Sequence, residues 1–116
     1  MLCIINGRVV SWGGNEAGQL GLDDYTPTSW AQVVAGPSNV IAVSAGVYHS
    51  LALDANGAVW TWGSNINGRL GDGTSDNFRP YAYRLPNLPR IVAISAGGSH
   101  SVAVAADGSV WTWGNN

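Results

Sequence analysis

The apolar residues of this chain fall into short runs that alternate with polar segments containing glycine. Val, Ile and Trp dominate these runs, and Asn-Gly, Asp-Gly or Pro bounds them. Short runs of β-branched and aromatic residues between turn signals are typical of strands. The pattern therefore predicts an all-β chain, with strands of one unit near Val59 to Trp62, Tyr81 to Leu85, Ile91 to Ser95 and Ser101 to Val104.

The runs recur with a period of about 51 residues, the range expected of repeat architectures. Three blocks recur in register: Asn6 to Gly13 at Asn56 to Gly63 and at Asp107 to Gly114, Val43 to Leu53 at Ile94 to Val104, and Gly18 to Gly21 at Gly68 to Gly71. We divide the single unit 1–116 into repeat 1 at about 6–55, repeat 2 at about 56–106 and a partial third repeat at about 107–116.

Each repeat contains one tight hairpin. The dipeptides Asn6-Gly7, Asn56-Gly57 and Asp107-Gly108 lie between two apolar runs and tolerate the positive φ angles of a type I′ turn. A unit of four antiparallel strands in about 51 residues matches a β-propeller blade, and one blade cannot cover both of its own apolar faces. The sequence therefore predicts propeller blades that form an incomplete ring.

Several blocks resemble the repeats of the regulator of chromosome condensation family. They are Trp62 to Asn65 with Gly68 to Gly71, then Ala96-Gly97 with His100 to Val104 and Asp107 to Trp111. The resemblance implies a propeller of roughly seven blades. It also implies activities that range from nucleotide exchange on a small GTPase and chromatin binding to light perception and enzyme inhibition, so the fold alone does not fix the function.

With two full repeats, the ring needs completion, and we expect it to come from self-association. Head-to-tail contact of the chain with itself gives six blades as a trimer or eight as a tetramer. Segment 14–40 carries three acidic residues and no basic one, whereas 64–90 carries four arginines and two aspartates, which favours such a contact. The alternatives are a fragment of a longer family member that acts in protein binding or small-GTPase regulation, and a sugar-binding propeller.

We expect no catalytic, cofactor or metal site and no enzyme activity. His49 and His100 occupy equivalent positions in successive repeats, which favours a hydrogen bond within the blade over a shared metal. A triad of Ser50, His49 and Asp54 is disfavoured because adjacent strand residues point to opposite faces. The residues that we assign to structural repeat positions are Trp12, Trp62, Trp113, His49, His100, Gly46, Gly97, Gly57 and Gly108.

The repeats differ most in their long loops, Asp23 to Trp30 and Asp76 to Arg84. Aromatic rings and guanidinium groups are enriched at protein interfaces. We therefore predict a partner-binding surface for another protein at Phe78, Arg79, Tyr81, Tyr83 and Arg84. Because Tyr81 and Tyr83 alternate as in a strand, one face of this segment is expected to belong to the core.

Composition narrows the function further. Hydrophobic residues make up 46% of the chain and charged residues 10%, the net charge is −2, and all five basic residues are arginine, so the basic surface of a nucleic-acid-binding protein is missing. Cys3 has no intrachain partner for a disulfide. No apolar run approaches the length of a membrane span, and Met1 to Ile5 lacks the charged start of a signal peptide, so we expect no membrane partner.

Overall fold

The structure is a computed structural model that describes residues 1–65, 78–86 and 88–114. Within these ranges the chain is made of β-strands, as the alternation of apolar runs and turns predicts. The strands are β1 (Leu2–Ile5), β2 (Arg8–Gly13), β3 (Thr28–Val33), β4 (Val40–Ala45), β5 (His49–Asp54), β6 (Val59–Ser64), β7 (Phe78–Arg84), β8 (Ile91–Ala96), β9 (His100–Ala105) and β10 (Val110–Gly114).

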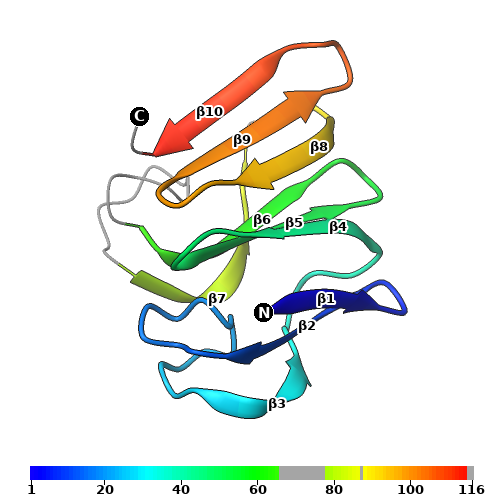
Figure 1. The fold of residues 1–116 in the computed structure, drawn as a ribbon. Helices are drawn as coiled ribbons and strands as arrows, with labels where there is room; N and C mark the ends of the chain where they lie inside the picture. The colour runs from blue at the N-terminus through cyan, green and yellow to red at the C-terminus, as the bar shows by residue number, and fades with distance from the viewer. Residues whose placement is uncertain (66–77, 87, 115–116) are drawn as a thin grey trace.

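The strands form three antiparallel sheets that stack face against face (Figure 1). The middle sheet has four strands in the order β4-β5-β6-β7, whereas the two outer sheets, β1-β2-β3 and β10-β9-β8, have three each. The middle sheet is a complete propeller blade. Its strand order confirms the four-stranded blade that the repeat predicts.

The sequence repeat and the blade are out of phase by two strands. Strands β4 and β5 end the first repeat and β6 and β7 begin the second, yet the four hydrogen-bond to one another in one sheet. Each repeat therefore contributes half of one blade and half of the next. The peptide chain itself holds neighbouring blades together, because the short connection 34–39 between β3 and β4 crosses from the first sheet to the middle one.

The three hairpins are of two kinds, which corrects the expectation of a common type I′ turn. Asn6 and Gly7 have φ angles of 51° and 75°, so the first hairpin is the predicted turn. In the other two, only Gly57 (83°) and Gly108 (91°) have positive φ, and the Gly57 amide donates to the Asp54 carbonyl oxygen at 3.0 Å. These are longer loops that end in a left-handed glycine.

The core lies between the sheets. One cluster of buried side chains joins the first sheet to the middle one, and a second joins the middle sheet to the third. The first cluster contains Val9, Val34, Val40, Ala52 and Trp62, and the second contains Leu53, Val59, Leu85, Ile91, Ala103 and Ala105. Burial of these apolar side chains at the sheet interfaces is the main force that stabilises the stack.

Candidate functional site

A histidine joins the middle blade to the third one. His49 begins β5 and is fully buried, and its Nε2 lies 3.0 Å from the Ser101 Oγ on β9. The sequence predicts a hydrogen bond within the blade, whereas this bond joins two blades. A second contact of the same kind joins the inner strands, where the Ala96 amide on β8 donates to the Ser44 Oγ on β4 at 2.9 Å.

Two glycines make room for the repeat histidines. A Cβ atom on Gly46 would overlap the His49 ring and the Gly97 carbonyl oxygen, and a Cβ on Gly97 would overlap the His100 ring. Neither glycine has a positive φ angle, so the backbone conformation does not require glycine at these positions. Glycine is required because a side chain would have no space there. In each repeat, the imidazole ring of the histidine occupies the space that a Cβ atom of this residue would take.

The tryptophan strand of one blade receives a loop from the blade before it. Trp62 is fully buried, and its Nε1 donates to the Gln19 carbonyl oxygen at 2.8 Å. The Ser50 Oγ donates to the same oxygen at 2.9 Å. A Cβ on Gly21 would lie 2.8 Å from the Trp62 Nε1, so this glycine lets the loop come close. The recurring Gly18 to Gly21 block is thus an inter-blade contact, and its counterpart at 68–71 lies outside the described residues.

Ser50, His49 and Asp54 do not form a catalytic triad. Asp54 instead supports the second hairpin, where its Oδ1 accepts from the Asn56 and Ala58 amides at 2.9 and 3.0 Å and its Oδ2 accepts from the Trp60 Nε1 at 3.2 Å. This structural role was missed in the sequence, although an aspartate two residues before Asn-Gly is a recognisable turn signal. Among the described residues, no three His, Cys, Asp or Glu side chains come together as metal ligands.

The third hairpin uses its aspartate differently. The Ser109 amide and hydroxyl donate to the Asp107 Oδ1 at 2.9 and 2.6 Å, and the Trp111 Nε1 donates to the Ser109 Oγ at 3.1 Å. The hydrogen bonds from Ser109 lower the pKa of Asp107 below its usual value of 3.8 because they stabilise the carboxylate. Asp107 is fully exposed, so this is a local property of the turn.

The predicted partner surface lies on β7, the outermost strand of the middle blade. Arg79 is only 8% exposed, and its guanidinium carbon lies 4.2 Å from the Tyr83 ring centre and 5.4 Å from that of Tyr81. The two tyrosines are themselves exposed, and the face of β7 that meets the core is that of Ala82. Arg79, Tyr81 and Tyr83 therefore lie together on one face of β7, with the guanidinium against the two exposed rings.

The other two residues of the predicted surface lie apart from this stack. Phe78 meets Tyr25 of the first blade edge to face, with 6.3 Å between ring centres and 81° between ring planes. Arg84 is exposed at the opposite end of β7 and lines a separate hollow with Leu85 and Arg90. The described part of the chain holds no helix that is long and apolar enough to span a membrane.

The sheets, hairpins and inter-blade contacts define a β-propeller repeat protein. A profile of the regulator of chromosome condensation (RCC1) repeat matches residues 6–53 and 56–104, and a second profile of this repeat matches 40–69. The chain belongs to the regulator of chromosome condensation repeat family. The resemblance carried by the tryptophan, histidine and glycine blocks is therefore confirmed.

The relatives of this chain are longer proteins. It is 36% identical over 115 residues to the probable E3 ubiquitin-protein ligase HERC6 of Homo sapiens, which covers 95% of this chain and 11% of that protein. It is 37% identical over 111 residues to the regulator of chromosome condensation of Drosophila melanogaster, which covers 94% of this chain and 20% of that protein.

Two solved structures share the fold. The crystal structure of human WBSCR16 matches with a TM-score of 0.90 and 27% identity over 97% of this chain and 30% of that one. Yeast RCC1 (Prp20), solved with Kap60 bound to it, matches with a TM-score of 0.80 and 29% identity over 92% of this chain and 28% of that one. The chain thus spans less than a third of the length of each of these four proteins.

Replacement of Gly46 by alanine should lower the free energy of unfolding by about 1–3 kcal/mol, because the new methyl group overlaps the His49 ring and the Gly97 carbonyl oxygen. Gly14→Ala is the matched control, since a Cβ there meets no atom within 4 Å. Urea denaturation of both variants measures the difference. Equal stability of the two variants would contradict the close packing of the inter-blade contact.

Ser101→Ala should cost about 1–3 kcal/mol, since it leaves the buried His49 Nε2 without its bond to the next blade. Ser38→Ala, at an exposed serine, should change stability by less than about 0.5 kcal/mol. Hydrogen exchange of the β9 amides shows whether the loss of stability lies at the contact between the blades. Unchanged protection of β9 in the Ser101 variant would show that the bond does not join the blades.

Acid should weaken the third hairpin through Asp107. Its pKa is lower in the folded chain than in the unfolded chain, so the stabilisation is complete above about pH 4 and is lost as the pH falls through the folded value. Thermal unfolding of wild type and Asp107→Asn should therefore differ near neutral pH and converge in acid. A difference that stays constant with pH would refute the role of the carboxylate.

Proposed function

We propose that this chain is a non-enzymatic protein-binding scaffold that extends by stacking its blades head to tail on further copies of itself. The observation that supports this is the pair of open sheet faces at the two ends of the stack. Val110 on β10 is 62% exposed, whereas Val59 at the equivalent position of the middle blade is fully buried against its neighbour. Trp12 is likewise only partly buried, while its equivalent Trp62 is fully buried.

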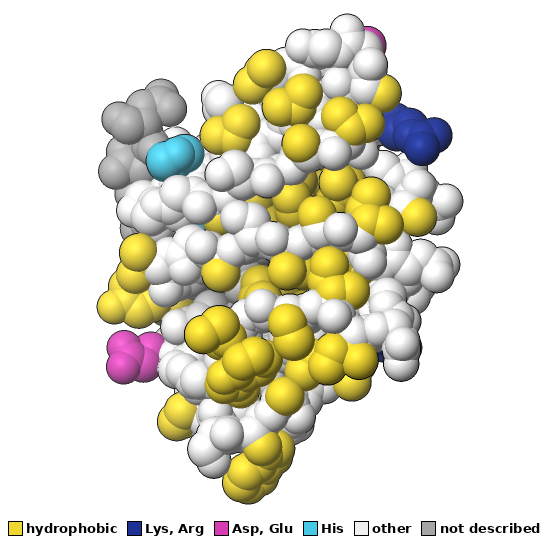
Figure 2. All heavy atoms as spheres, turned by 45° about the vertical axis from the view of Figure 1, so that its right-hand side comes forward, with side chains coloured by type: hydrophobic (Ala, Val, Ile, Leu, Met, Phe, Trp, Pro, Cys, Tyr) yellow, Lys and Arg dark blue, Asp and Glu magenta, His cyan; other side chains and the backbone are white. Residues whose placement is uncertain are grey.

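The remaining surface fits a chain that binds other proteins. On the face shown in Figure 2, hydrophobic side chains are spread from the top to the bottom of the stack, and charged side chains lie only near its margin. The exposed apolar residues include Ile41 and Val92, which are equivalent positions of the inner strands β4 and β8. Extended apolar surface of this kind is a mark of interaction sites.

Closure of such a ring involves the two terminal hairpins, β1-β2 and β9-β10. Two repeats per chain give six blades as a trimer or eight as a tetramer. The β9-β10 hairpin of one copy and the β1-β2 hairpin of the next then belong to the same position in the shared blade, since both are copies of one repeat element. In the ring that we propose, β9-β10 keeps its place, so that His100 can meet Ser50 of the next copy as His49 meets Ser101, and β1-β2 is displaced.

A second candidate is a segment of a longer propeller, in which further repeats cover the open faces and the whole ring binds a protein or regulates a small GTPase. The observation that favours it is the surplus hairpin. Closing a ring of copies requires β1-β2 to leave its sheet, whereas further repeats on either side would complete both outer sheets with both hairpins in place. The relatives also include an X-linked retinitis pigmentosa GTPase regulator homolog of Caenorhabditis elegans.

The mass in solution separates the two candidates. Native mass spectrometry across a dilution series should show a discrete trimer or tetramer for the wild type and a monomer for Val110→Asp, because a buried unpaired carboxylate opposes stacking. Val47→Asp is the control, since Val47 is equally exposed but lies in the loop between β4 and β5. A wild type that is monomeric at every concentration would overturn stacking and favour the longer propeller.

A further inference from the structure

A groove runs along the outer side of the first and middle blades, between β3 and β7. It consists of a hollow of about 310 Å³ beside β3 and one of about 500 Å³ that reaches β7. Leu22 and Gln32 line both hollows, so the two adjoin each other. The Leu22 backbone bridges to Tyr81, and the Asp23 amide donates to the Pro80 carbonyl oxygen at 2.7 Å, which fixes the loop that forms the floor.

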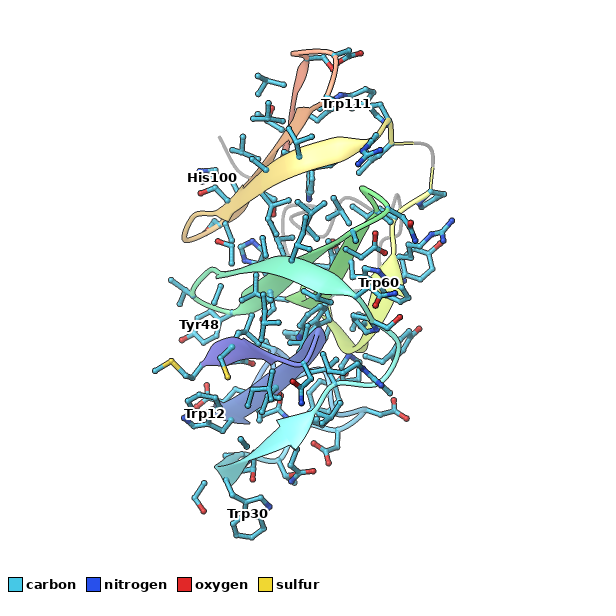
Figure 3. All side chains as sticks on the ribbon, turned by 90° about the vertical axis from the view of Figure 1, so that its right-hand side faces the viewer. Trp12, Trp30, Tyr48, Trp60, His100 and Trp111 are labelled. Atoms are coloured by element: carbon cyan, nitrogen blue, oxygen red, sulfur yellow. The ribbon has the colours of Figure 1, made fainter. Side chains whose placement is uncertain are left out.

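An exposed aromatic ring stands at each end of this groove, at the same position of the repeat. Gln32 pairs with Ser11 of β2, and Tyr83 pairs with Thr61, the equivalent residue of β6. Trp30 and Tyr81 each lie two residues earlier, so they are equivalent as well. Trp30 is 69% exposed and Tyr81 is 48% exposed. Figure 3 shows Trp30 at the end of the stack, pointing away from the sheets. Neither ring belongs to the two core clusters.

The two blades differ in what accompanies the aromatic ring. On β7, Arg79 lies beside Tyr81 and Tyr83 and supplies a cation to both rings. On β3 the residue equivalent to Arg79 is Thr28, and segment 14–40 contains no basic residue. Trp30 therefore offers an aromatic face like that of Tyr81, but no guanidinium of this chain lies beside it on β3.

Carboxylates take the place of the cation on this side of the groove. Asp24 lines the hollow that contains Trp30, and Asp23 lines the hollow that contains Tyr81. The Asp24 Oδ1 accepts from the Asn15 Nδ2 at 3.0 Å and from the Thr26 amide at 3.2 Å, which holds the carboxylate in position. Both aspartates are exposed, so an incoming charge can reach them.

We propose that this groove binds an arginine side chain within an extended segment of a partner protein. The guanidinium stacks on Trp30 as that of Arg79 stacks on Tyr83, and it pairs with the carboxylate of Asp24. Apolar side chains of the same segment lie on Leu22 and Tyr81. Charge complementarity selects a basic peptide over a neutral sugar, because aromatic faces and carboxylates both attract cations.

The groove is formed within one chain by β3, β7 and the loop between β2 and β3, so a single chain contains it. The probe is a short fluorescein-labelled peptide of alternating arginine and leucine, and binding to the full chain is followed by fluorescence anisotropy. Trp30→Ala should weaken binding by about fivefold or more. Trp111→Ala is the matched control, since this partly exposed tryptophan lies on β10, in the third sheet.

The charge is tested by a second variant, Asp23→Asn with Asp24→Asn. Asn tolerates the positive φ of 64° at Asp23 and keeps an amide oxygen at Asp24, so the fold is preserved while both charges are removed. Binding of the arginine peptide should weaken by about fivefold and lose much of its dependence on salt. Circular dichroism confirms that each variant is folded.

Other results would overturn the proposal. Equal affinity of wild type and the Trp30 variant would do so, as would equal binding of a matched peptide of alternating glutamate and leucine. Binding on a glycan array that depends on Trp30, with no binding of the arginine peptide, would assign the groove to a carbohydrate instead. Native mass measured on the same samples distinguishes a failure of this site from a failure of stacking.

Discussion

Contact between neighbouring sheets is the constraint on which the rest of this structure depends. Each sheet has two apolar faces, and a sheet of this size cannot bury either without another sheet against it. The contact is specified by polar groups as well as by packing. His49 reaches Ser101 and Trp62 reaches Gln19 across the boundary, so each blade recognises the next by hydrogen bonds between residues far apart in the chain.

The offset between repeat and blade strengthens this dependence. Because a repeat supplies two strands to one sheet and two to the next, neither sheet can form fully from one repeat alone. Folding of one blade therefore promotes folding of its neighbour, as in other linear repeat proteins. The same offset leaves half a blade on each side of the complete one, and β1 and β10 extend each half to three strands. The open faces of these outer sheets are the basis of the stacking proposal.

The inner contacts are nearly identical in each repeat, whereas the outer strands differ. Gly46 and Gly97 make room for equivalent histidines, whereas the equivalent positions on β3 and β7 hold a neutral Thr28 and a cationic Arg79. Scaffold positions are restricted by packing, while outer positions are free to change because they contact solvent. This division explains why specificity is to be sought on the perimeter of the blades.

The sequence by itself determined the repeat, the strands and the hairpins, because short apolar runs and turn dipeptides act over a few residues. It did not show that His49 bonds to the next blade, that Asp54 supports a turn, or that only Asn6-Gly7 forms a type I′ turn. Those features depend on which strands become neighbours in space. Only the tertiary structure placed the Trp30 and Tyr81 rings along one groove with the two aspartates, since residues some 50 positions apart meet there only after the sheets have stacked.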